Sequence, residues 1–173
     1  MRTADGWVAD ADFAEATSWR SLRCTAWQFR STGESSMASR VLLPDGWAKP
    51  VGYANGIETP PGKIVFVAGQ VGWNAHQEFT TAELAPQFEQ ALKNVLAVLG
   101  AAGGRATHIC RMTAYCTDKR AYLDARPELG RIWRRLMGRH YPAMSLIFVT
   151  DLLDQPGKIE LEATAVIPPP GSQ

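Results

Sequence analysis

The stretch from Tyr141 to Val166 constrains the fold more than any other part of this chain. Its first half holds an apolar run from Leu146 to Val149, and its second half, after a turn, alternates in character. With a period of two residues, Glu160, Glu162 and Thr164 share one face, while the residues between them are apolar. The pattern predicts two strands joined by a turn. Paired acids on a strand form either a solvated sheet face or a catalytic wall, and both interpretations stay open here.

The rest of the chain predicts an α+β domain. Strands are expected over Val41–Leu43, Gly52–Ile57, Lys63–Ala68 and His108–Thr117, and helices over Thr81–Ala102 and Lys119–Gly138. Together with the two strands above, the order predicts a single mixed β-sheet with two helices packed on one face. The apolar face of the first helix is expected to hold Leu84, Phe88, Leu92, Val95 and Leu99, and that of the second Tyr122, Leu123, Leu129, Ile132, Trp133 and Leu136.

Three details of these elements are predicted from particular residues. The Thr59-Pro-Pro-Gly62 turn is expected to join the second and third strands into a hairpin. Thr81 is the expected N-cap of the first helix. Pro127 is expected to interrupt the second helix, because proline lacks the backbone N–H that continues the hydrogen-bonding pattern.

The strand over His108–Thr117 has two faces of different chemistry. Cys110, Met112, Ala114 and Cys116 are expected to pack on a helix, and Arg111, Thr113 and Tyr115 point the other way. A polar face on a long central strand must meet water, a ligand or a partner subunit.

Composition excludes several classes of function. A formal charge of +1 gives no long-range attraction to nucleic acid or membranes. No apolar run approaches the roughly 18 residues that span a bilayer, and we expect a cytoplasmic protein.

Cys110 and Cys116 would lie about 20 Å apart on one strand, too far for a disulfide. His76, His108 and His140 have no metal-ligand spacing, so neither a metal nor a cofactor is expected.

Four segments carry a family resemblance. Gly52-Tyr-Ala-Asn-Gly-Ile57, the run Lys63–Ala68 leading into Gly69-Gln70, Pro142-Ala143-x-Ser145 and Lys158-Ile159-Glu160 resemble the RidA (YjgF) family of small trimeric enamine and imine deaminases. The segments occur in the family's order, and the resemblance extends over roughly Val41 to Ile167. It implies a chorismate-mutase-like fold, a homotrimer with a barrel-like core, and clefts between protomers. It also implies a small-molecule enamine or imine as substrate.

The resemblance also implies roles for individual residues. Glu160 matches the family's catalytic acid, which positions water and transfers protons, and Tyr53 matches the tyrosine that closes the cleft. The backbone around Gly69 and Ser145 would offer amides to the substrate. Two alternatives remain open: Glu160 forms an interfacial salt bridge with Arg111, or Tyr53 is only an aromatic residue on an edge strand.

The chain departs from the family at Met144. Members that hydrolyse 2-aminoacrylate have an arginine there, and its planar fork binds the substrate carboxylate through two charge-assisted hydrogen bonds. Arg126 and Arg111 are the candidates to bind an acid from another direction, although Arg126 could equally cap a break before Pro127. We therefore expect either an imine hydrolase that is inefficient on 2-aminoacrylate, with an apolar pocket shaped by Met144, Tyr53 and Trp73, or a non-catalytic ligand-binding or regulatory trimer.

Residues 1–36 match nothing in the family and are interpreted as an N-terminal extension to a domain over residues 37–173. Either the extension reflects the choice of an upstream start codon, with Met37 as the family-like opening, or its large aromatic residues dock on the domain. The sequence does not decide between them.

Overall fold

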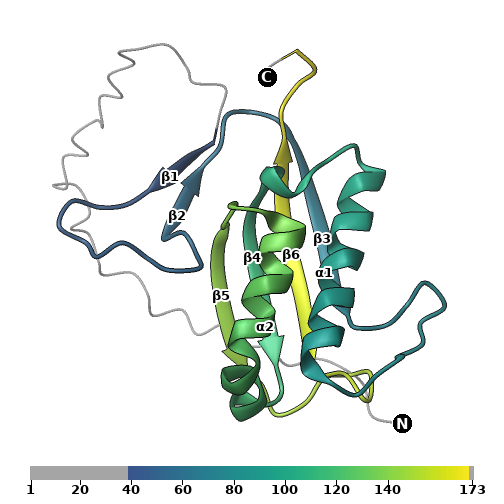
Figure 1. Cartoon of the computed structure of the whole chain (residues 1–173). Helices are drawn as coiled ribbons and strands as arrows, with labels where there is room; N and C mark the ends of the chain where they lie inside the picture. The colour runs from purple at the N-terminus through teal and green to yellow at the C-terminus, as the bar shows by residue number, and fades with distance from the viewer. Residues whose placement is uncertain (1–38, 172–173) are drawn as a thin grey trace, which may run out of the picture. The chain divides into compact units, whose positions relative to one another are not determined.

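A computed structural model describes residues 39–171 of the chain (Figure 1). The predicted order of strands and helices is confirmed there. The elements are β1 (Arg40–Leu42), β2 (Gly56–Glu58), β3 (Lys63–Val71), α1 (Leu84–Ala101), a 3-10 turn (Ala106–His108), β4 (Ile109–Cys116), α2 (Lys119–Met137), β5 (Ala143–Phe148) and β6 (Ile159–Ile167). The expected N-terminal extension lies outside the described residues.

The main sheet has four strands in the order β3-β6-β4-β5. Strand β4 runs parallel to β5 and antiparallel to β6, so the sheet is mixed. The helices α1 and α2 cover the same face of this sheet (Figure 1), as predicted. The α+β class expected from the sequence is therefore confirmed.

The first strands do not pair as predicted. β2 pairs antiparallel with β1 in a separate two-stranded ribbon, and β3 pairs with β6 instead of forming a hairpin with β2. Pro60 and Pro61 explain the difference, because two fixed φ angles and two missing N–H donors favour an extended connection over a tight turn. The described residues thus contain two sheets, linked where Ala54 forms a parallel bridge to Ala143 of β5.

The core lies between the helices and the sheet. All five residues predicted for the apolar face of α1 are buried there: Leu84, Phe88, Leu92, Val95 and Leu99. On α2 the predicted stripe is correct at Leu129, Ile132 and Trp133, whereas Leu123 is 46% exposed. The amphipathic period therefore identified the packed face of each helix, with one error on α2.

The helix boundaries correct two predictions. Thr81 does not cap α1, because the helix begins at Leu84 and the Thr81 hydroxyl accepts a hydrogen bond from Glu83 N at 3.0 Å instead. Pro127 lies inside α2 without interrupting it. Proline leaves only the carbonyl four residues earlier without its partner, and that residue, Leu123, is on the exposed side, where water can hydrogen-bond to the carbonyl.

Strand β4 has the two predicted faces, with one exception. Met112, Ala114 and Cys116 are buried toward the helices, as expected. The pairing of β4 with β6 shifts between Ile109 and Arg111, and Ile109 enters the core in place of Cys110. A bulge inserts one residue and reverses the alternation on one side of it, and periodicity alone could not locate it.

Within residues 39–171 no helix is long and apolar enough to cross a membrane. The same range contains no group of three His, Cys, Asp or Glu side chains placed to hold a metal ion.

Candidate functional site

Glu160 lies on the face of the sheet that the helices leave uncovered. It is on β6, opposite Tyr115 of β4, and its neighbours Ile159 and Leu161 are buried in the core on the other face. Its carboxylate lies directly over the backbone of Gly69 on β3. A Cβ atom built on Gly69 would be 1.6 Å from Glu160 Oε1, so only glycine leaves room for the acid there.

The local irregularity of β3 creates this close approach. The register between β3 and β6 shifts between Val67 and Gln70, which places Gly69 in a bulge. Glycine in a strand often marks a bulge or a site where another group comes near the backbone. The structure thus brings together Glu160 and Gly69, two residues predicted for the site from separate segments.

The environment of Glu160 disfavours its charged form. Burial raises the pKa of the Glu160 carboxyl above its ordinary value, and the negative charges of Asp154 and Glu162 raise this pKa further. No described residue donates a hydrogen bond to this carboxylate or forms an ion pair with it. An acid with a raised pKa and free oxygens is suited to take and return a proton during a reaction.

The neighbouring polar groups are paired with one another instead. Arg111 lies 3.9 Å from Glu162 Oε1, and the Tyr115 hydroxyl donates to the same oxygen at 3.3 Å. Arg111 also donates to the Thr113 hydroxyl at 3.3 Å. Desolvation raises the pKa of Tyr115, and the Glu162 charge adds to the rise, so the phenol stays a donor. Within the chain, Arg111 therefore pairs with Glu162 and not with Glu160.

A buried glutamine fixes the entry to β6. The Gln87 side-chain amide donates to Thr81 O at 2.9 Å and to Pro156 O at 3.0 Å, and its oxygen accepts from Lys158 N at 2.6 Å. These three bonds tie the start of α1 to the loop before β6. They hold the strand two residues from Glu160. Sequence reasoning missed this contribution, because a polar residue on an otherwise apolar helix face carries no signal of its partners.

A pocket of about 440 Å³ opens on the other face of the sheet, between α2 and β5. Tyr53, Arg126 and Met144, which were predicted to bind substrate, all line it. Met144 is half-buried against the core, and Tyr53 is 43% exposed. Three residues distant in sequence thus border one pocket.

Aromatic rings form much of the pocket wall. Trp133 stacks nearly parallel with Tyr141, with ring centroids 5.9 Å apart and planes 6° apart, and it also stacks with Phe88 at 6.5 Å. Tyr122 also lines the pocket and packs edge-on against Phe148. Phe88, Tyr122 and Trp133 were predicted only as members of apolar helix faces, because such a face does not reveal which of its residues border a cavity.

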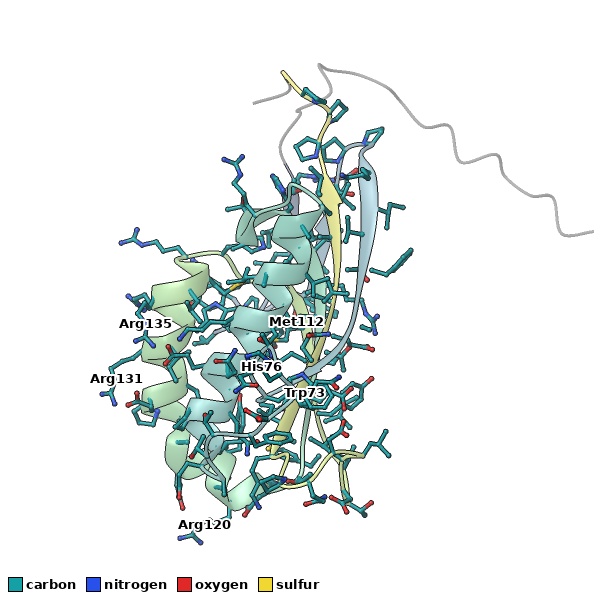
Figure 2. The ribbon with its side chains drawn as sticks, turned by 90° about the vertical axis from the view of Figure 1, so that its right-hand side faces the viewer. Trp73, His76, Met112, Arg120, Arg131 and Arg135 are labelled. Atoms are coloured by element: carbon teal, nitrogen blue, oxygen red, sulfur yellow. The ribbon has the colours of Figure 1, made fainter. Side chains whose placement is uncertain are left out.

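Trp73, which was expected to shape the same pocket, does not line it. Its ring packs against Phe79 at 6.1 Å, and its carbonyl accepts a hydrogen bond from Asn94 at 2.9 Å. Trp73 lies in the segment after β3 (Figure 2) and stabilises that turn.

Arg126 does not cap a break, because α2 is continuous there. The positive charge of Arg126 affects the pKa of Tyr122. Burial raises the pKa of the Tyr122 phenol, and the charge of Arg126 partly offsets this rise. No described carboxylate lies within 4.0 Å of its guanidinium. This leaves its hydrogen-bond donors available to a ligand.

The predicted site residues therefore fall into two groups on opposite faces of one sheet. Met144 is in register with Met112, which faces the helices, whereas Glu160 is in register with Tyr115, which faces away. Ser145 is in register with Thr113 and lies on the Glu160 side. A single substrate cannot touch both groups within one chain, since the sheet separates them.

Comparison with known proteins identifies the family. Residues 48–167 match the family described as Endoribonuclease L-PSP. The chain belongs to this family, which is the RidA (YjgF) family expected from the sequence.

Individual relatives agree with this assignment. A Rid-family protein of unknown function from Yersinia pestis, YyfB, is 32% identical, with 76% of this chain and 100% of that chain covered and a TM-score of 0.67. Escherichia coli TdcF, solved with serine bound, is 27% identical with a TM-score of 0.53 over 78% of this chain and 96% of its own. A protein of Dermatophagoides farinae named 2-iminobutanoate/2-iminopropanoate deaminase is 23% identical over 74% of this chain and 96% of its own length.

Proposed function

We propose that the protein is a hydrolase that deaminates an imine or enamine at a cleft between subunits. The single observation that carries this proposal is the position of Glu160, an unpaired carboxylate with a raised pKa that lies over the bare backbone of Gly69. Hydrolysis of an imine requires a directed water molecule and a group that exchanges protons as ammonia leaves. Glu160 would supply the proton transfer, and the exposed backbone near it would orient the substrate.

The proposal requires a second subunit. The pocket with Met144 and the carboxylate of Glu160 lie on opposite faces of the sheet, so one copy would contribute the pocket and its neighbour the acid. The uncovered face also carries large exposed apolar side chains, with Ile64 at 58%, Phe66 at 77% and Ile147 at 43% exposure. An apolar surface of this kind is typical of a subunit interface. We expect the homotrimer that the resemblance implies.

Efficient hydrolysis of 2-aminoacrylate is not expected. Met144 presents a thioether where the family's deaminases present a guanidinium, and losing hydrogen bonds to a charged group costs about 1.5 to 3 kcal/mol. The same substitution favours the second candidate function, a trimer that binds a small ligand without turning it over.

An ammonia-release assay against a panel of imines separates these functions. We expect the wild-type protein to accelerate the hydrolysis of at least one imine, and Glu160→Gln to lower that turnover by about 100-fold or more. Glu128→Gln, an exposed acid on α2, is the control and should leave turnover unchanged. Ligand binding without turnover of any imine would favour the non-catalytic trimer. Equal turnover by the wild-type protein and Glu160→Gln would refute the catalytic role of this acid.

A further inference from the structure

The size of the pocket bordered by Met144 exceeds what a small imino acid needs. Its volume of about 440 Å³ falls in the range of roughly 300 to 1,000 Å³ found for pockets that bury much larger ligands. A three-carbon imino acid would fill a small part of this space and contact few of the lining residues. Because dispersion contacts are lost wherever a wall has no partner atoms, a small ligand would bind weakly here.

The aromatic residues that line the pocket are suited to contact a flat ring. Trp133 stacks with both Phe88 and Tyr141, and its indole N–H donates to His140 O at 3.1 Å, which restrains the ring. Aromatic walls that are held in place offer a ligand ring stacked or edge contacts without first being ordered. The surrounding side chains include the apolar Leu129 and Leu146, which cannot form hydrogen bonds. A ligand with a polar side chain would therefore be disfavoured next to them.

Among residues 39–171, Arg126 is the only charged residue in the lining of this pocket. Three other arginines of α2 have acidic partners: Arg120 pairs with Asp124 at 3.1 Å, Arg131 with Glu128, and Arg135 with Glu89 at 2.6 Å. Arg134 has no ion pair among the described residues, but it lies outside the pocket lining. Figure 2 shows Arg120, Arg131 and Arg135 projecting outward from α2. Arg126 has no such partner among the described residues, and its fork of donors matches the two oxygens of a carboxylate.

We propose that this pocket selects 2-imino acids with a bulky aromatic side chain, whose ring packs against the aromatic wall and whose carboxylate is bound by Arg126. In the family's deaminases an arginine at the position of Met144, on β5, binds the substrate carboxylate. Here Arg126 of α2 would bind it instead. This inference deepens the proposed function and rests on it for the reaction. In that reaction water adds its oxygen to the imine carbon, the C–N bond breaks, and nitrogen leaves as ammonia with both water protons, giving the 2-oxo acid without any redox change.

The ligand class is tested by binding, without turnover. Isothermal titration calorimetry of the full-length protein would compare three ketones: phenylpyruvate, pyruvate, which lacks the ring, and phenylacetone, in which a methyl group replaces the carboxylate. We expect phenylpyruvate to bind at least tenfold more tightly than either of the others. Equal affinity for phenylpyruvate and pyruvate would overturn the aromatic preference, and equal affinity for phenylpyruvate and phenylacetone would overturn the carboxylate site.

Two arginine variants on the same helix locate the carboxylate site. Arg126→Gln should weaken phenylpyruvate binding by about 10- to 100-fold and leave phenylacetone binding unchanged. Arg134→Gln removes the same charge from α2 outside the pocket lining and should change neither. Arg126→Lys, which keeps the charge but not the fork, should fall between the wild-type protein and Arg126→Gln. An equal loss in Arg126→Gln and Arg134→Gln would refute the assignment, because it would indicate only a change in net charge.

The ammonia-release assay keeps the two proposals separate. Tight binding of phenylpyruvate with no hydrolysis of its imine would leave the ligand class standing and refute the deaminase function. Rapid hydrolysis of 2-iminopropanoate, with no preference for the aromatic imine and no effect of Arg126→Gln, would support the deaminase function and refute the proposed ligand class.

Discussion

Gly69→Ala is the sharpest test of whether Glu160 is catalytic, because it displaces the carboxylate without removing it. The new Cβ would lie 1.6 Å from Glu160 Oε1, 2.6 Å from Cδ and 3.0 Å from Cγ. An ordinary contact begins near 3.4 Å, so the oxygen must move by about 1.8 Å. The displaced atoms belong to the far end of a flexible side chain, and Gly69 is not among the residues with positive φ. The backbone therefore accepts alanine.

The expected effects on stability and turnover are very different. Moving Glu160 to another conformer costs about 0.5 to 1.5 kcal/mol if it leaves its rotamer minimum. Alanine lowers the conformational entropy of the unfolded chain, which stabilises the folded state by about 0.4 to 1 kcal/mol. The net change in unfolding free energy should stay below about 1 kcal/mol, or about 4 °C in Tm. A misplacement of 1 Å can lower turnover by about 100-fold, and we expect at least that loss.

Two other glycines serve as matched controls in the same thermal-unfolding and ammonia-release assays. At Gly72 the new Cβ would lie 2.5 Å from Gln87 Cβ and 2.6 Å from its Cα, which cannot swing away, so Gly72→Ala should cost about 1 to 3 kcal/mol. At Gly100 nothing lies within 4 Å, and Gly100→Ala should stabilise α1 by about 0.5 to 1 kcal/mol. A Gly69→Ala protein with wild-type turnover would refute the proposed chemistry at Glu160.

Three further predictions follow from the same structure. Met144→Arg should create or raise activity on 2-aminoacrylate, measured with Tm because a half-buried charge beside Arg126 is destabilising; a folded variant that stays inactive would show that this position alone does not control substrate choice. Glu160→Gln should melt above the wild-type protein at pH 8, with the difference shrinking toward pH 4. The raised pKa of Glu160 means that the folded state binds more protons than the unfolded one between the ordinary and the raised value, so wild-type stability falls as pH rises through that window. A wild-type Tm above that of Glu160→Gln at pH 8 would instead mean that a partner stabilises the charge. Light scattering at micromolar concentration should give about three times the chain mass of 18.9 kDa, and a stable monomer would rule out a site shared between subunits.

Local rules predicted the elements of this protein where the signal was periodic. The alternation in β6 placed Glu160 and Glu162 on one face and the apolar residues on the other, and the helical period of α1 selected its buried side. The errors arose where a long-range contact decided the outcome. Thr81 had the chemistry of an N-cap, but the Gln87 amide binds its carbonyl and the helix begins later.

For the candidate site, too, some features could be predicted from the sequence and others depended on tertiary structure. The resemblance to the family, carried by short sequence motifs, pointed to Glu160, Gly69, Tyr53 and Arg126, and to the departure at Met144. Tertiary structure decided that Gly69 leaves room for the Glu160 carboxylate and that Tyr53, Arg126 and Met144 border one aromatic pocket. It also decided that the acid and the pocket lie on opposite faces of the sheet. Sequence fixes which groups are present and which face of its own element each one takes. Distances between elements depend on strand register and bulges, and these are set by packing between segments far apart in the chain.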